Sequence, residues 1–162
     1  MTVLVWLTES TWRATVDAAR THARAGAAVT LLHVTADDVA EAAHGAFAGL
    51  LGRGHRERDP GDQVAALAER SAGELLEAAA VRLGRPAQRL RLHGRVEQEV
   101  VRAAAGADLL VCARDGDPHR PGPRSLSAAT RFVVDHAPSP VLLVWPGPAP
   151  GLDALPPHPP RH

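Results

Sequence analysis

The stretch that decides the fold is DLLVCARDGDPHRPGPRSLSAATRFVVDHAPSPVLLVW, residues 108–145. It begins with an apolar run, Leu109 to Ala113, typical of a strand buried on both faces of a parallel sheet. A loop rich in charge, Gly and Pro follows, and then about eleven residues with helical periodicity. Pro138 and Pro140 end that helix, and Val141 to Trp145 is predicted to form a second strand. A strand, a polar loop and a helix N-terminus in this order form anion and nucleotide sites in α/β proteins.

The rest of the chain alternates strands and helices around this stretch. The predicted strands cover residues 2–7, 28–34, 89–92, 109–113 and 141–145. The predicted helices cover residues 12–23, 36–51, 62–83, 96–104 and 126–136, with a surface loop at 52–61. This alternation requires a parallel sheet with helices on both faces, joined by right-handed crossovers. The carboxyl ends of the strands are then expected to surround one crevice.

The residue pattern also predicts details of the helices. Ser10 or Thr11 is expected to cap the first helix with its hydroxyl. The buried face of the long third helix is expected to carry Val64, Leu67, Ser71, Leu75 and Ala79. In the last helix, one face is expected to carry Leu126, Ala129, Val133 and His136.

Composition limits the possible functions. The formal net charge is zero, so no overall attraction to nucleic acid or to an anionic membrane is expected. The chain has no Lys, which excludes a Walker phosphate loop and a phosphoacceptor receiver domain. No apolar run reaches 18 residues and no basic region opens the chain, so neither a transmembrane helix nor a signal peptide is expected, and a cytoplasmic location is predicted. The single cysteine, Cys112, is interpreted as a small core residue.

The chain is predicted to form one domain followed by a tail. Residues 1–146 contain every predicted strand and helix. The remaining segment, residues 147–162, is about half Pro and Gly and is expected to be disordered.

Three runs of sequence carry a resemblance to a known family. They are LLHV (31–34), HGRVEQEVVRAAAGADLLVCA (93–113) and DHAPSPVLLVW (135–145). With the order and lengths of the elements, they make the chain similar to the universal stress protein family up to about Trp145. The resemblance implies a three-layer α/β/α fold, adenine nucleotide alpha hydrolase-like, with a five-stranded parallel sheet of order 3-2-1-4-5. It also implies a small binding or regulatory protein of the stress response, which commonly forms a homodimer through its last strand, here Val141 to Trp145.

Nucleotide-binding members of that family carry a phosphate loop of the form G-x2-G-x9-G-[S/T] and an Asp after the first strand. In this chain the first Gly corresponds to Ala113, the second is Gly116, and ten residues follow instead of nine. The closing pair falls on Ser127-Ala128, or on Leu126-Ser127 if the spacing is kept, and the Asp position is Thr8. A Cβ at these positions restricts backbone conformation and the approach of a phosphate.

Two alternatives therefore remain for the ligand. In the first, the loop has lost nucleotide binding. In the second, the chain binds ATP or another adenine nucleotide, because Arg and His side chains replace the missing glycines as phosphate ligands. The candidate nucleotide-binding residues are Thr8, Glu9, Val34, Ala113, Arg114, Gly116, Ser127 and Ala128, and the candidate phosphate-binding residues are His119, Arg120 and Arg124. No metal site is predicted.

Catalysis is the least favoured interpretation. Two sets of residues could meet at the crevice, Ser10 with His33 and Glu9, and Ser125 with His119. Neither stands in a Gly-x-Ser-x-Gly turn, and no cluster of residues has metal-ligand spacing. The chain is therefore not expected to be an enzyme, although slow ATP hydrolysis stays open.

Overall fold

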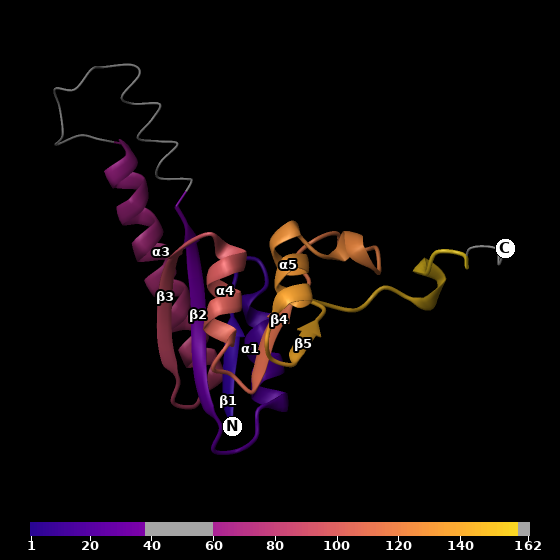
Figure 1. Ribbon diagram of the computed structural model, residues 1–162, viewed down its shortest axis with the longest axis horizontal. Coiled ribbons are helices and arrows are strands. Elements are labelled where there is room, and N and C mark those ends of the chain that lie inside the picture. Colours follow the sequence, from indigo (N-terminus) through magenta and orange to yellow (C-terminus); the bar gives the residue numbers. More distant parts are fainter. Residues whose placement is uncertain (38–59, 159–162) are drawn as a thin grey trace.

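A computed structural model describes residues 1–37 and 60–158 of the chain (Figure 1). Its centre is a five-stranded parallel sheet of order β3-β2-β1-β4-β5, which confirms the predicted order. The strands are β1 (Thr2–Trp6), β2 (Ala28–Ala36), β3 (Gln88–Gly94), β4 (Leu109–Ala113) and β5 (Val141–Val144).

Four α-helices lie in the described part of the chain. They are α1 (Trp12–His22), α3 (Pro60–Leu83), α4 (Val96–Ala104) and α5 (Ala128–His136). Short 3₁₀ helices cover Pro123–Ser125 and Leu152–Ala154. Of the helix predicted for residues 36–51, residue 36 ends β2, and residues 38–51 lie outside the described residues. Of the predicted loop 52–61, residues 52–59 also lie outside them, and Pro60 and Gly61 begin α3.

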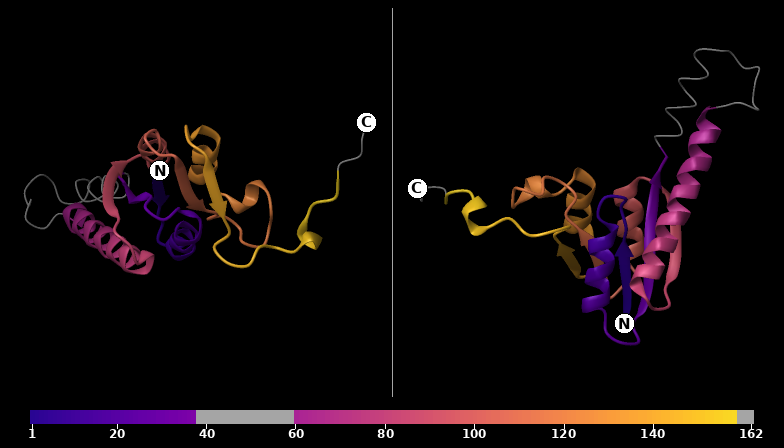
Figure 2. Two further views of the ribbon diagram at one scale, coloured as in Figure 1. Left: turned by 90° about the horizontal axis from the view of Figure 1, so that it is seen from below. Right: turned by 180° about the vertical axis from the view of Figure 1, so that it is seen from behind.

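The helices cover both faces of the sheet, as Figure 2 shows from below. Along β1, Val3 and Val5 pack with α1 and α3 on one face, whereas Leu4 and Trp6 pack with α4 and α5 on the other. Burying each such side chain stabilises the fold by about 1.5–3 kcal/mol. Cys112 lies in the second core, 1% exposed, so its interpretation as a core residue is confirmed. The three-layer α/β/α architecture follows from these two cores.

The sheet has a step at its carboxyl edge. The last residue of β1, Trp6, pairs with Leu32, but β2 and β3 continue side by side for four more residues, to the pair Ala36–Gly94. Both strands are therefore longer than the sequence pattern predicts. Helix α3 also projects past the end of β1 on the same side (Figure 1). The step leaves a wall of β2, β3 and α3 standing above the end of β1.

This projection explains one error in the predicted helix faces. Leu67 was assigned to the buried face of α3, yet it is 60% exposed. The buried residues of α3 are concentrated further along, from Ala72 to Leu83, where the helix lies against the sheet. Helical spacing identifies a face correctly, but it cannot show where the sheet beneath that face ends.

Two residues at the ends of helices make contacts that the sequence pattern did not predict. His136 is exposed, because its ring stacks on Phe132 with a centroid distance of 4.0 Å and its Nδ1 lies 2.8 Å from the Phe132 carbonyl oxygen. Thr11 occupies the N-cap of α1, but its hydroxyl caps no backbone N–H and lies 2.7 Å from the Thr8 hydroxyl instead. The Thr8 carbonyl accepts the N–H groups of Thr11 and Trp12.

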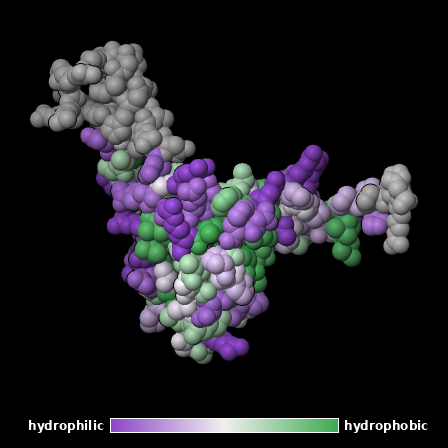
Figure 3. Space-filling view, viewed as in Figure 1, coloured by the Kyte–Doolittle hydropathy of each residue, from purple (hydrophilic) through white to green (hydrophobic). Residues whose placement is uncertain are grey.

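The tail leaves the end of β5 and runs away from the sheet (Figures 1 and 2). Its apolar side chains Leu152 and Leu155 are 85% and 55% exposed. Figure 3 shows hydrophobic, green surface on the tail. The division into a domain of residues 1–146 and a disordered tail stays a prediction. Within residues 1–37 and 60–158, no helix is both long and apolar enough to cross a membrane.

Candidate functional site

The loop between β4 and α5 closes on itself. The N–H of Gly116 donates to the Ser125 carbonyl at 2.9 Å, and the N–H of Asp117 donates to the Arg124 carbonyl at 2.8 Å. These two bonds hold the beginning of the loop against its end. Backbone groups that a phosphate ligand would need are thus already bonded within the loop.

Gly116 is needed for this closure. A Cβ at this position would lie 2.5 Å from the Arg124 carbonyl oxygen and 2.6 Å from the Ser125 carbonyl carbon. Real Cβ atoms essentially never approach backbone so closely, so the two segments could not pair with any other residue here. The one glycine that the loop shares with the family pattern therefore has a structural reason within this chain.

The N-terminus of α5 already holds a carboxylate. The Ser127 N–H donates to Asp115 Oδ1 at 2.9 Å, and the Ser127 hydroxyl donates to Asp115 Oδ2 at 2.8 Å. Ser127 Oγ also accepts the N–H of Thr130 at 3.2 Å, which confirms Ser127 as the N-cap of α5. Asp115 supplies negative charge where helix dipole and free N–H groups would attract a phosphate. Sequence reasoning missed this role, since Asp115 lies twelve residues before Ser127.

Arg114 is held at the far end of β4. Its Nη1 donates to the Ser125 hydroxyl at 2.5 Å, and its guanidinium carbon lies 4.7 Å from the ring centroid of Trp145. Trp145 follows β5, so Arg114 is drawn towards the outer edge of the sheet. The sequence suggested Arg114 as a nucleotide-binding residue, and in the structure its side chain joins the loop to the residue that follows the last strand.

The three candidate phosphate ligands lie on the surface of the loop. His119, Arg120 and Arg124 are all exposed. The backbone N–H of His119 donates to Asp117 Oδ1 at 2.9 Å, and Arg120 Nε lies 3.8 Å from Asp117 Oδ2. Asp117 therefore partly neutralises the charge that these side chains bring to the loop.

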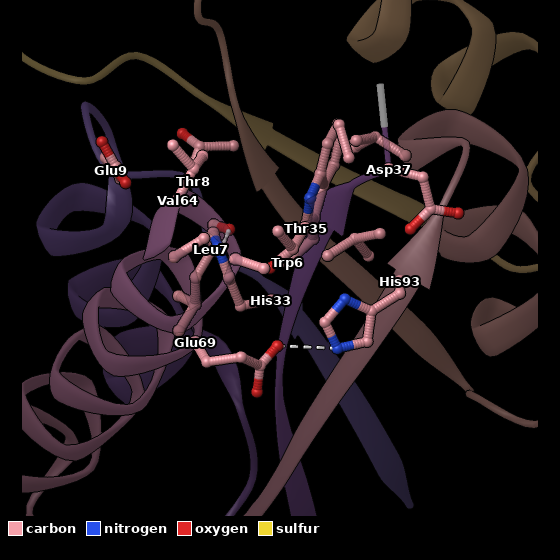
Figure 4. Close-up of a pocket in the computed structure, with 15 residues that line it drawn as sticks. Trp6, Leu7, Thr8, Glu9, His33, Thr35, Asp37, Val64, Glu69 and His93 are labelled. Atoms are coloured by element: carbon pink, nitrogen blue, oxygen red, sulfur yellow. Dashed lines mark hydrogen bonds and ion pairs between the residues drawn. The ribbon is translucent and has the colours of Figure 1, made fainter. Parts of the chain in front are cut away.

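Thr8, Glu9 and Val34 meet at a separate pocket, on the step of the sheet (Figure 4). The pocket has a volume of about 660 Å³. Its lining residues within the described part of the chain are Trp6, Leu7, Thr8, Glu9, His33, Val34, Thr35, Ala36, Asp37, Val64, Ala65, Ala68, Glu69, His93 and Val96. The structure thus divides the candidate residues into two groups, because Ala113, Arg114, Gly116, Ser127 and Ala128 do not line this pocket.

The polar groups of the pocket come from three elements. His33 on β2 places its Nδ1 3.0 Å from the Leu7 carbonyl oxygen. Glu69 on α3 has Oε1 2.8 Å from His93 Nε2 and Oε2 3.3 Å from Arg91 Nη1, both on β3. His93 was expected at this crevice from its place after a predicted strand. Sequence analysis did not select Glu69, since no local pattern shows that the first half of α3 lies against the end of β3.

Neither predicted serine–histidine pair appears among these contacts. The Ser125 hydroxyl donates to the Gly122 carbonyl at 2.6 Å and accepts from Arg114. His33 Nδ1 lies against the Leu7 carbonyl oxygen, and Ser10 does not line the pocket.

The single cysteine is not a reactive thiol. Burial raises the pKa of the Cys112 thiol to about 12, so it stays protonated at neutral pH. Across the described ranges, no group of three or more His, Cys, Asp or Glu residues could hold a metal ion.

Comparison with protein families gives one match. Residues 1–144 match the model of the universal stress protein family. No curated protein sequence matches the chain.

Solved structures of low sequence identity share the fold. The hypothetical protein MJ0577, described as a test case of structural genomics, is 17% identical with a TM-score of 0.61, over 89% of this chain and 94% of its own. Universal stress protein UspA from Lactobacillus plantarum is 20% identical with a TM-score of 0.55, over 88% and 96%. A universal stress protein in complex with cAMP is 18% identical with a TM-score of 0.60, over 91% and 98%.

Proposed function

Because the chain belongs to the universal stress protein family, we propose that it is a small binding and regulatory protein of the stress response whose phosphate loop no longer holds a nucleotide. It acts without catalysis. The observation that carries this proposal is the Asp115 carboxylate at the N-terminus of α5, bonded to both the N–H and the hydroxyl of Ser127.

Charge repulsion supports the proposal. A phosphate at the Ser127 N–H would have to displace Asp115 or lie beside it. Two like unit charges 4 Å apart repel by about 1 kcal/mol in water and about 4 kcal/mol near a protein surface. A triphosphate brings several such charges, and the tight approach at Gly116 leaves its backbone N–H bonded to Ser125.

The second candidate function is binding of ATP or another adenine nucleotide. One similar protein was solved in complex with cAMP, and the exposed His119, Arg120 and Arg124 bring positive charge to this loop. In this alternative, Thr8, Glu9 and Val34 surround the base and the loop side chains replace backbone amides as phosphate ligands.

Isothermal titration calorimetry with magnesium ATP, and separately with cAMP, separates the two functions. We expect no heat of binding for ATP up to millimolar concentration and no rise in the melting temperature. Saturable binding of ATP that is lost on replacing Arg120 and Arg124 together by Ala would overturn the proposal in favour of the alternative. Binding of cAMP alone would also contradict a loop that holds no nucleotide.

The proposal includes a homodimer formed through β5. This strand is the last in the sheet order and has β4 as its single neighbour among the described strands. All four of its residues, Val141 to Val144, are only half-buried. An apolar edge strand of this kind pairs readily with another chain, and a second copy of itself is the simplest partner.

A further inference from the structure

The pocket on the step of the sheet has an apolar interior. Its floor is the end of β1, and its walls are β2, β3 and the projecting half of α3 (Figure 4). Apolar side chains come from four elements, β1, β2, α3 and α4, and they are those of Trp6, Val34, Val64, Ala68 and Val96. A cavity of about 660 Å³ is within the range of roughly 300–1,000 Å³ that small-molecule sites occupy.

The charged groups around this interior are acidic. Glu9, Asp37 and Glu69 line the pocket, and no Arg stands among its described lining residues. Arg91 neutralises part of the Glu69 charge from outside, at 3.3 Å. Two histidines, His33 and His93, and two threonines, Thr8 and Thr35, are the other polar residues of the described lining. The described lining therefore favours a positive ligand over a negative one.

One carboxylate oxygen lacks a proper hydrogen bond. Oε1 of Glu69 is buried and has no hydrogen-bond donor in good geometry. His93 Nε2 lies 2.8 Å from this oxygen and forms an ion pair with it only when the imidazole is protonated. A buried carboxylate oxygen gains most from a charged N–H donor. In Figure 4, Glu69 and His93 point towards each other across the mouth of the pocket.

We infer that this pocket binds a small organic cation, an ammonium group carried on an apolar body. The apolar body occupies the space between Trp6, Val64 and Val96, and the ammonium group donates to Glu69 Oε1. None of the pocket residues belongs to the β4–α5 loop, but Thr8, Glu9 and Val34 of the pocket would surround the base in the adenine-nucleotide alternative, so the inference rests on the proposed loss of nucleotide binding.

A matched series of probes tests the charge preference. Phenethylamine, 2-phenylethanol and 3-phenylpropionate share a ring and a short chain but are positive, neutral and negative at pH 7. Saturation-transfer NMR and calorimetry on the full chain are expected to detect the amine, with at least tenfold weaker binding of the carboxylate and intermediate binding of the alcohol. The indole N–H signal of Trp6 should shift with the amine, since this side chain lines the pocket.

Two glutamates of α3 provide a controlled comparison. Glu69→Gln removes the charge at the pocket, whereas Glu77→Gln removes an equivalent ion pair, with Arg89 of β3 at 2.8 Å, on residues that do not line it. We expect Glu69→Gln to weaken amine binding five- to tenfold and Glu77→Gln to leave it unchanged. A second variant, Ala68→Leu, keeps every charge and fills the pocket from α3, and it should abolish binding of both the amine and the alcohol.

The inference is overturned if the three probes bind equally or not at all, or if Glu69→Gln and Glu77→Gln have the same effect on amine binding. If Glu69→Gln does not fold, the Ala68→Leu variant and the probe series still test whether the pocket binds an organic cation. Titration with ATP distinguishes failure of this inference from failure of the proposed loss of nucleotide binding. ATP binding without amine preference would contradict this inference, whereas amine binding together with ATP binding would contradict only the proposed loss of nucleotide binding.

Discussion

The place of Gly116 in a sequence motif suggests one role, and its contacts in the structure indicate another. Its place in a phosphate-loop pattern suggested that it lets a ligand approach the backbone. In the structure the backbone that approaches it is the chain's own, at Arg124 and Ser125. The same absence of a Cβ serves either purpose, so residue type alone could not distinguish them.

Replacing Gly116 by Ala is expected to destabilise the protein by about 1–3 kcal/mol, because the added methyl group forces the two sides of the loop apart. Urea unfolding followed by circular dichroism measures the change. Gly106→Ala is the matched control, since nothing lies within 4 Å of a Cβ built there, and it should stay within about 0.5 kcal/mol of the parent protein. Equal stability of the two variants would show that the loop is not closed as described.

The pocket residues were partly predictable. Thr8, Glu9 and Val34 could be expected at one crevice, because each follows or ends a strand of a parallel sheet. His93 follows another predicted strand of the sheet and could be expected there too. Glu69 could not, since its meeting with His93 depends on how far β2, β3 and α3 project past β1. That length is set by tertiary pairing and not by any local pattern.

At the scale of single elements, the N-terminus of α5 was predicted in outline only. A serine before an apolar helix is a common N-cap, and Ser127 is the N-cap of α5. The second capping group, Asp115, lies twelve residues earlier and is brought there by closure of the loop. Capping residues are normally sought directly before a helix or in its first turn. A carboxylate that reaches the helix only through closure of the loop cannot be found in that way.

Asp115→Ala is expected to destabilise the protein by about 1–2 kcal/mol, because the Ser127 N–H loses its acceptor and the helix N-terminus loses a favourable charge. Thermal or urea unfolding gives the value. Asp117→Ala is the control within the same loop, since Asp117 accepts the His119 N–H but caps no helix, and a smaller loss is expected there. A larger loss for Asp117→Ala than for Asp115→Ala would contradict the capping role.

For the whole molecule, the sheet order could be predicted in full. Alternating strands and helices with right-handed crossovers admit few arrangements, and the runs around residues 31–34, 93–113 and 135–145 identified which one. The lengths of the elements were less predictable. Leu67 fits the apolar spacing of α3 but lies beyond the edge of the sheet, and only the assembled molecule has such an edge.

Assembly through β5 is the prediction that belongs to the molecule as a whole. Sedimentation velocity at micromolar concentration should give a dimer for the parent chain. Val144→Glu should shift it towards monomer, with dissociation at least tenfold stronger, because Val144 is a half-exposed residue of β5 outside both apolar cores and two copies would bring like charges together at the paired edge. Val81→Glu makes the same chemical change at a valine of α3 that is 74% exposed, and it should leave the dimer intact. A monomeric parent chain, or equal dissociation in the two variants, would show that β5 is not the surface through which two copies associate.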